Sequence, residues 1–282
     1  MQFTKMQGLG NDYIYLHDPD KRLTDPAALA VKMSDRRFGI GGDGIILILP
    51  SKKASAKIKI FNADGSEAEM CGNAIRCVAK LLRDRGIVRE KAFLIETKAG
   101  LKKVNIIREL PGQTQVKVDM GPPSLYSNEI PLTGPKRKVT DEPLVVEGKE
   151  LKITCVSMGN PHCVLFFPKI SSKLVRALGP VLENYPLFPN KTNVEFVQVL
   201  SEDALHMQVW ERGSGETMAC GTGACASVVA GRLKGHLAPE VRVILPGGEL
   251  KISWEGEEKP VFMTGPAVTV FTGEWSDETQ SL

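Results

Sequence analysis

The sequence predicts an α+β protein made of two pseudo-symmetric repeated domains, each a mixed sheet or barrel wrapped around a central helix, with a cleft between them. Two observations carry this prediction. One fixed residue offset relates the first half of the chain to the second half. Within each half, short apolar and β-branched stretches that are typical of strands alternate with segments whose apolar residues recur at helical spacing.

The repeat is visible in polar and apolar positions together. Asn160 follows Asn11 by 149 residues (160 − 11), and Cys220 follows Cys71 by the same number (220 − 71). No gap is needed between residues 11 and 86, and a chance match would not keep its register over that length. Other pairs joined by this offset are Gly10/Gly159, Ile45/Val194, Phe61/Trp210, Glu67/Glu216, Gly72/Gly221 and Gly86/Gly235.

Each half has the same expected order of elements. A strand, a helix and two strands come first, at 12–16, 26–34, 45–49 and 57–61, and again at 162–167, 172–178, 194–199 and 205–210. A second helix starts just after each cysteine of the repeat and stops near Gly86 or Gly235. Further strands are expected at 92–97, 102–107, 115–119, 240–245, 249–254 and 260–264. Gly121-Pro122-Pro123 separates the domains, residues 1–121 and 122–265.

Composition excludes several classes of protein. The chain has 282 residues, a net charge of +3, 42% hydrophobic and 24% charged residues, which are values of a soluble globular protein. It has no run of 18 apolar residues, no signal-peptide core at its start and no broad basic stripe. We therefore expect a cytoplasmic protein with no membrane or nucleic-acid partner. Six cysteines are too few for a disulfide framework, and no C-x-x-C pair supports structural zinc.

A glycine-rich segment, Gly39-Ile40-Gly41-Gly42-Asp43-Gly44, matches G-x-G-x-x-G. A dinucleotide site requires a strand before this motif and a helix after it. Here a polar helical stretch precedes the motif and the β-type run 45–49 follows it. The context is reversed, so the segment is interpreted as a tight loop that enters a strand, without a nucleotide cofactor.

Cys71 and Cys220 are the candidate catalytic residues. Each is followed by glycine, each lies at the start of an expected helix, and both occupy one position of the repeat. The positive end of a helix lowers the pKa of a thiol. Buried cysteines usually act as small apolar residues, and this interpretation is kept for the other four, Cys77, Cys155, Cys163 and Cys225.

Two repeats related by a pseudo-twofold axis would bring these cysteines face to face. Two helix N-termini that point at one place offer unpaired N–H groups, a natural carboxylate site. With an α-amino acid bound there, one thiolate can remove the α-proton while the opposite thiol supplies a new one. The sequence therefore predicts a cofactor-independent amino-acid epimerase whose N–H donors stabilise the developing negative charge.

Several polar positions of the repeat are further candidates. Asn11 and Asn160 are equivalent, and Asn62 and Glu211 each lie nine residues before a cysteine (71 − 62 and 220 − 211). One half therefore carries a charge where the other carries a neutral amide, as a pseudo-symmetric site with an asymmetric substrate requires. Structural roles, such as turns for asparagine or a surface salt bridge for Glu211-Arg212, remain the alternative.

With these residues in view, the whole chain closely resembles the diaminopimelate epimerase family. The motifs that carry the resemblance are Gly8-Leu9-Gly10-Asn11-Asp12, Phe61-Asn62-Ala63-Asp64-Gly65-Ser66, Cys71-Gly72-Asn73 with Arg76-Cys77, Gly159-Asn160-Pro161-His162, Asn193-Val194-Glu195-Phe196, and Glu211-Arg212 through Ala219-Cys220-Gly221-Thr222-Gly223. Proline and hydroxyproline racemases share the C-G-T-G element, but a histidine typically stands where this chain has Asn73.

The resemblance implies interconversion of LL- and meso-diaminopimelate, for lysine and peptidoglycan biosynthesis, with Cys71 and Cys220 as the two acid/base residues. It implies an active site in the cleft, a homodimer, no metal, no pyridoxal phosphate or other cofactor, and residues 266–282 returning to the first domain. His162 and Glu211 would modulate the cysteine pKa values. The implied substrate-binding residues are Asn11, Asn62, Gly72, Asn73, Asn160, Asn193, Glu211, Arg212, Gly221 and Thr222. Gly44, where some members carry glutamine, is not among them.

Two alternatives remain open from the sequence. A proline- or hydroxyproline-type racemase would use the same two-thiol chemistry, although Asn73 and Glu211-Arg212 disfavour it. A redox-sensing or binding protein could instead form a reversible disulfide between the paired cysteines. Turnover would separate an enzyme from a redox or binding protein, and reaction with proline alone would indicate the racemase.

Overall fold

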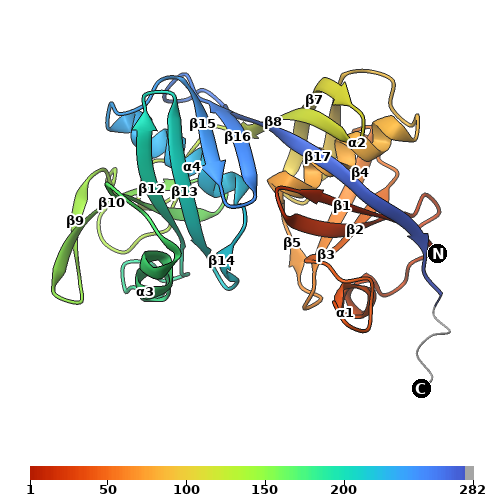
Figure 1. The fold of residues 1–282 in the computed structure, drawn as a ribbon, viewed down its shortest axis with the longest axis horizontal. Helices are drawn as coiled ribbons and strands as arrows, with labels where there is room; N and C mark the ends of the chain where they lie inside the picture. The colour runs from red at the N-terminus through yellow and green to blue at the C-terminus, as the bar shows by residue number, and fades with distance from the viewer. Residues whose placement is uncertain (277–282) are drawn as a thin grey trace. The chain divides into compact units, whose positions relative to one another are not determined.

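The computed structural model describes residues 1–276. Its contacts divide the chain into two compact units, one of residues 1–118 with 265 onward and the other of residues 119–264. The chain passes from one unit to the other within two strands, β8 (Gln113–Gly121) and β17 (Val261–Glu274). The fold is α+β, with two helices and a mixed sheet in each unit (Figure 1).

The first unit is a ring of strands around one helix. Hydrogen-bonded neighbours run β1-β2-β3-β4-β6-β7-β8-β17, and β17 returns to β1 to complete the ring. The remaining bounds are β1 (Gln2–Gly8), β2 (Asn11–His17), α1 (Pro26–Ser34), β3 (Gly44–Leu49), β4 (Ala56–Asn62), β5 (Glu67–Ala68), α2 (Gly72–Asp84), β6 (Ala92–Thr97) and β7 (Gly100–Leu110). The antiparallel pairing of β1 with β17 sets residues 268–274 beside residues 2–7.

The second unit repeats this plan. Its sheet runs β9-β10-β11-β12-β13-β15-β16-β17, with the short β14 on β13. The bounds are β9 (Glu142–Val146), β10 (Lys149–Ser157), β11 (Pro161–Phe166), α3 (Ser172–Glu183), β12 (Asn193–Ser201), β13 (Ala204–Glu211), β14 (Gly215–Thr217), α4 (Gly221–Leu233), β15 (Glu240–Leu245) and β16 (Gly248–Ser253).

The repeat is as regular in structure as in sequence. The helix α4 begins and ends 149 residues after α2 (221 − 72 and 233 − 84). The parallel pair β2/β3 sets Tyr13 beside Gly44, and the parallel pair β11/β12 sets His162 beside Asn193, again at that offset (162 − 13 and 193 − 44). Equivalent residues of the two units therefore occupy equivalent places in their own sheets.

The helices α2 and α4 are central in their units, as predicted. Every residue of α2 from Gly72 to Leu82 is buried, and so are nine consecutive residues of α4, 223–231. A helix on the surface of a sheet buries only one stripe, so burial all round means that the strands enclose the helix. The other face of the first sheet packs on α1, where Leu29 and Met33 meet Ile14 and Ile45. Strands covered on both faces explain the continuous apolar runs in the sequence.

Two predicted boundaries are wrong. The strand expected at 260–264 continues to Glu274 as β17. The helix α3 was expected to end at residue 178, before Gly179-Pro180, but it continues to Glu183. Proline removes one helical hydrogen bond, and here tertiary contacts outweigh that cost. Val175 and Leu182 enter the core of the unit, and Gly179 lies so close to Trp210 that a Cβ atom would be 2.5 Å from its ring.

The glycine-rich segment is a loop that enters a strand, as interpreted from the sequence. It connects α1 to β3, and its backbone N–H groups bond to carbonyl groups at the end of α1, such as Met33 and Ser34. Gly44 itself starts β3 opposite Asn62. A Cβ atom at Gly44 would lie 2.0 Å from the Phe61 carbonyl oxygen, so no side chain fits and none contributes to a site there.

Candidate active site

Cys71 is the N-cap residue of α2, the position that the repeat predicts. Its Sγ accepts a hydrogen bond from the Ala74 backbone N–H at 3.5 Å and lies 3.4 Å from Asn11 Oδ1. An N-cap side chain normally satisfies one of the free N–H groups of the first helical turn. Sulfur fills this role here, which fixes the thiol at the helix N-terminus and beside an asparagine of the candidate set.

Cys220 is the N-cap residue of α4. Its Sγ accepts from the Gly223 backbone N–H at 3.4 Å and lies 3.5 Å from Thr222 Oγ1. Only 5% of the residue is exposed. Each unit therefore presents one thiol at the start of its buried helix, where the first-turn N–H groups have no partner within the helix and favour an anion.

Gly223, the third residue of α4, is a glycine for a local reason. A Cβ atom on Gly223 would lie 2.6 Å from Glu195 Oε1 and 3.3 Å from the Cys220 sulfur. Asn73, by contrast, is largely buried and its Oδ1 accepts a hydrogen bond from Arg76 at 2.9 Å. The amide oxygen of Asn73 is therefore occupied within the protein, and backbone N–H groups are the better candidates for binding a carboxylate.

A chain of polar contacts leads to Cys220 from the middle of the second unit. His162 and Glu195 are fully buried, and His162 Nδ1 lies 2.7 Å from Glu195 Oε1. His162 Nε2 lies 3.0 Å from Asn160 Oδ1, and Asn160 Nδ2 donates to Thr222 Oγ1 at 3.3 Å. The sequence motif contained Glu195 but gave no reason to assign it a role, because a glutamate in a strand is usually solvated. Its Oε2 is buried and has no hydrogen bond among the described residues.

Burial and two nearby carboxylates favour the thiol form of Cys220. Burial raises the pKa of the Cys220 thiol well above its ordinary value, and the charges of Glu211 and Glu195 raise that pKa further. The hydrogen bonds from Thr222 and the Gly223 N–H act in the opposite direction but are weaker. The expected lowering by the helix N-terminus is therefore wrong for Cys220, because desolvation and two nearby negative charges outweigh it.

Glu211 faces this thiol and is itself perturbed. Burial raises the pKa of Glu211, and the negative charge of Glu195 adds to the increase. Hydrogen bonds with the Thr217 hydroxyl and the Cys220 thiol lower it in part. Glu211 and His162, the two residues expected to tune the cysteines, thus lie in one network with Cys220 and with Glu195.

The remaining candidates, Asn193, Arg212 and Asn62, form hydrogen bonds within the loops of their own units. Asn193 donates to the Pro161 carbonyl oxygen at 2.8 Å and accepts from the Arg212 backbone N–H at 3.0 Å. The Arg212 guanidinium is exposed and reaches the Asn190 carbonyl oxygen at 3.3 Å. Asn62 Nδ2 donates to Ser66 Oγ at 3.0 Å. Asn193 therefore shapes the turn that presents Arg212, while the Arg212 side chain stays available to a ligand.

Glu183 is a supporting residue that the sequence did not reveal. It lies at the end of α3, accepts from Trp210 Nε1 at 2.8 Å and from the Gly213 backbone N–H at 2.9 Å. Both donors flank Glu211-Arg212. The sequence did not indicate this role because the expected helix ends at residue 178, five residues before Glu183.

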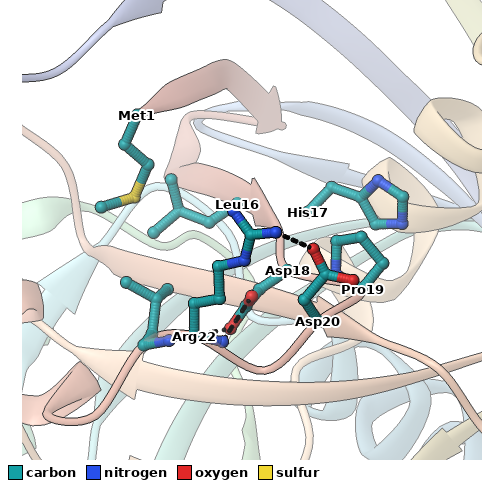
Figure 2. Close-up of a pocket in the computed structure, with 8 residues that line it drawn as sticks. Met1, Leu16, His17, Asp18, Pro19, Asp20 and Arg22 are labelled. Atoms are coloured by element: carbon teal, nitrogen blue, oxygen red, sulfur yellow. Dashed lines mark hydrogen bonds and ion pairs between the residues drawn. The ribbon is translucent and has the colours of Figure 1, made fainter.

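A surface hollow lies apart from these residues. Figure 2 shows its lining between Met1 and Arg22, which includes none of the candidate residues. The Asp18 carboxylate there accepts from the backbone N–H groups of Arg22 and Leu23, and the Arg22 guanidinium pairs with Asp20. These charges are satisfied within the loop.

Replacement of Glu211 by glutamine is expected to make Cys220 ionise at lower pH. The variant removes a negative charge and a carboxylate acceptor next to the thiol, and both changes lower the pKa of Cys220. Iodoacetamide alkylation, followed for each cysteine by mass spectrometry from about pH 6 to 10, should show the Cys220 midpoint moving down. Glu216→Gln removes a carboxylate that pairs with Arg176 instead and should leave the midpoint in place. An unchanged or higher midpoint in Glu211→Gln would contradict this electrostatic account.

Comparison with known proteins decides the family. The diaminopimelate epimerase family model matches residues 3–126 and 154–270. The chain belongs to the diaminopimelate epimerase family. It is 52% identical to a diaminopimelate epimerase of Pelotomaculum thermopropionicum, over 99% of this chain and 100% of that one. It is 50% identical to one of Acetivibrio thermocellus (97% and 98% covered) and 48% identical to one of Methanococcus maripaludis (97% and 99%).

Solved structures share the fold at low sequence identity. A hydroxyproline epimerase from Agrobacterium vitis matches with a TM-score of 0.68 and 16% identity, over 97% of this chain and 90% of that one. A phenazine biosynthesis protein of the PhzF family from Bacillus anthracis matches with a TM-score of 0.68 and 18% identity, over 98% and 99%. At these identities the likeness concerns the fold alone. Among residues 1–276, no helix is long and apolar enough to cross a membrane.

Proposed function

We propose that this protein interconverts LL- and meso-2,6-diaminopimelate without a cofactor. One cysteine removes the α-proton and a second cysteine supplies a new proton. The observation that carries the proposal is the presence of a thiol at the N-cap of the buried helix in each repeat, Cys71 on α2 and Cys220 on α4. Relatives of about half-identical sequence over nearly the full chain are diaminopimelate epimerases. The enzyme would serve lysine and peptidoglycan biosynthesis.

The proposed reaction uses the two cysteines in opposite roles. One thiolate takes the α-proton and becomes a thiol, and the electron pair of the broken C–H bond passes into the carboxylate. The other thiol donates its proton to the opposite face of the same carbon and becomes a thiolate. The configuration is inverted, atoms and charge balance, and the two cysteines exchange protonation states for the return reaction.

The substrate-free protein favours Cys220 as the thiol, because burial and the carboxylates raise its pKa. The first proton transfer would then begin from a thiolate at Cys71, with Cys220 as the donor. Backbone N–H groups in the first turns of α2 and α4 would bind the reacting carboxylate and stabilise the charge that develops on it. These N–H groups are already in place before the reaction, so they stabilise the negative charge as soon as the proton is transferred.

We propose contacts for the rest of the substrate from the family resemblance and from the loops of each unit. Asn11, Asn62, Gly72, Asn73, Asn160, Asn193, Glu211, Arg212, Gly221 and Thr222 are the proposed contacts. The exposed Arg212 guanidinium suits the distal carboxylate, since a guanidinium binds a carboxylate with two parallel hydrogen bonds. Glu211 suits an ammonium group. A homodimer in the cytoplasm is the proposed state of the enzyme.

Substrate assays test the proposal directly. Reduced protein, dialysed against chelator and free of pyridoxal phosphate, would be incubated with LL-diaminopimelate, L-proline or trans-4-hydroxy-L-proline, and the isomers separated by chiral chromatography. Appearance of meso-diaminopimelate with no change in the imino acids is the expected result. Turnover of an imino acid alone would establish the racemase alternative. No turnover of any of them by folded protein would exclude the epimerase and leave a redox or binding role.

A further inference from the structure

The two equivalent asparagines beside the cysteines are held in opposite orientations. In the first unit Asn11 Nδ2 donates to Asp43 Oδ2 at 2.8 Å, and Asn11 Oδ1 lies 3.4 Å from Cys71 Sγ. In the second unit Asn160 Oδ1 lies 3.0 Å from His162 Nε2, and its Nδ2 donates to Thr222 beside Cys220. The amide oxygen of Asn11 faces Cys71. The amide nitrogen of Asn160 faces Thr222, which in turn lies beside Cys220.

The Asn11 orientation follows from chemistry, because an ionised carboxylate can only accept hydrogen bonds. The atom 2.8 Å from Asp43 Oδ2 must therefore be the amide nitrogen, and the carbonyl oxygen is left to face Cys71. The same Oδ2 also accepts from the Asp12 backbone N–H at 3.1 Å, which fixes the carboxylate on the strand that carries Asn11. Asp43 Oδ1 accepts from the Arg36 guanidinium at 3.0 Å.

Arg36 locks this arrangement from the loop after α1. Its guanidinium forms two hydrogen bonds with the Asp12 carboxylate, at 2.7 and 3.2 Å, in addition to the one with Asp43. Lys5 pairs with Asp12 from β1 at 2.6 Å. Arg36 therefore holds Asp43 Oδ1, and Asp43 Oδ2 accepts hydrogen bonds from the Asn11 side chain and the Asp12 backbone.

The second unit lacks this acid. The residue equivalent to Asp43 is Thr192 (43 + 149), whose hydroxyl donates to the Asn193 carbonyl oxygen at 3.0 Å. Among the hydrogen bonds of residues 1–276, none joins Thr192 to Asn160. Asn160 is oriented instead by His162, which is held by Glu195. The orientation of each amide is thus set by a group found in only one repeat, and it breaks the symmetry of the two halves.

We infer that Asp43 is a positioning residue that holds the Asn11 carbonyl oxygen against the Cys71 thiol and so gives the S–H of Cys71 a fixed acceptor. A carbonyl oxygen accepts the S–H of a thiol and disfavours the thiolate, whereas an amide N–H in the same place would favour the thiolate. Asp43 would thus limit the ionisation of Cys71 and fix the direction of its S–H once Cys71 has taken the α-proton. The inference rests on the proposed roles of Cys71 and Asn11.

Asp43→Asn tests the inference, because a neutral amide at position 43 can present either oxygen or nitrogen and no longer fixes Asn11. Asp12→Asn is the matched control: it also weakens a carboxylate pair of Arg36, and among residues 1–276 the Asn11 side chain is hydrogen-bonded to Asp43 and not to the Asp12 carboxylate. Tyr15 also lies near Cys71 and is unchanged in both variants. Iodoacetamide alkylation of each cysteine, measured by mass spectrometry at about pH 8, reports on the thiols without any substrate.

In Asp43→Asn the alkylation rate of Cys71 is expected to rise about threefold or more, and kcat to fall about tenfold. The rate at Cys220 should not change, and Asp12→Asn should alkylate like the wild type. An unchanged Cys71 rate in folded Asp43→Asn, an equal rise at Cys220, or the same rise in Asp12→Asn would overturn the inference. Because alkylation needs no substrate, it distinguishes this failure from failure of the proposed function.

A measurement on the wild type keeps the inference testable if Asp43→Asn does not fold. The side-chain amide protons of Asn11 can be assigned by nuclear magnetic resonance from their loss in Asn11→Asp. Protection of these protons from hydrogen exchange is expected, because the amide nitrogen is bonded to Asp43. Unprotected, freely rotating amide protons would overturn the inference without any reference to activity.

Discussion

Replacing either Cys71 or Cys220 by alanine is expected to lower the rate of epimerisation by a factor of about a thousand or more. A positioned acid or base contributes about 10²–10⁴ in rate, and inversion at one carbon requires both a base on one face and an acid on the other. Loss of one thiol therefore stops the reaction in both directions. The measurement is the initial rate of meso-diaminopimelate formation, and of its reversal, by chiral chromatography.

The matched controls are Cys77→Ala and Cys225→Ala, since these cysteines lie in the same two helices and are fully buried. Each removes one buried sulfur, with a cost to stability of about 1 kcal/mol, and should retain activity within about threefold. Activity above roughly a tenth of the wild-type rate in Cys71→Ala or Cys220→Ala would contradict the two-thiol mechanism.

Arg76→Met is expected to lower the free energy of unfolding by about 3–5 kcal/mol, the second large effect. Arg76 is fully buried in α2 and donates to the Pro266 carbonyl oxygen at 3.1 Å, the Gly72 carbonyl oxygen at 3.1 Å and Asn73 Oδ1 at 2.9 Å. Methionine keeps much of the volume but removes the donor of all three buried hydrogen bonds, and each such loss costs up to about 1–3 kcal/mol.

Arg76 also joins the start of α2 to β17, so its loss should loosen the helix N-terminus that carries Cys71. Urea unfolding followed by circular dichroism measures the effect. Arg83→Met is the control in the same helix, because Arg83 is partly exposed and its ion pair with Glu109 is worth about 0.2–1 kcal/mol. Equal decreases in the free energy of unfolding of the two variants would show that the buried hydrogen bonds of Arg76 do not stabilise the protein more than a surface ion pair does.

The repeat made much of this fold predictable from the sequence. A constant offset preserves register, so α2 and α4, their cysteines and the adjoining strands could be placed before any coordinates. The pairing of β1 with β17 joins residues at opposite ends of the chain and followed only from the family resemblance. The extension of α3 through Pro180 was not predicted, because contacts with Trp210 and the core override the local preference of proline.

The site was predictable as a set of residues but not as a network. The cysteines and asparagines stand out by their positions in the repeat. Asp43, Glu195 and Glu183 have no counterpart in the other half that would single them out, and their roles depend on partners distant in sequence. The thiol form of Cys220 also required the structure, since the pattern shows the helix N-terminus but not the burial and carboxylates that outweigh it.

The isotope pattern of the first turnovers in D2O tests the two-thiol account most directly. LL-diaminopimelate would be incubated with the wild-type protein and sampled while only a small fraction has reacted, and each isomer analysed by mass spectrometry. The account predicts one deuterium at the inverted carbon of the meso product and none in the remaining LL substrate, because the abstracted proton and the donated deuteron belong to different cysteines. Deuterium accumulating in the unreacted LL isomer as fast as in the product would contradict it, since a single group would then remove and return the proton.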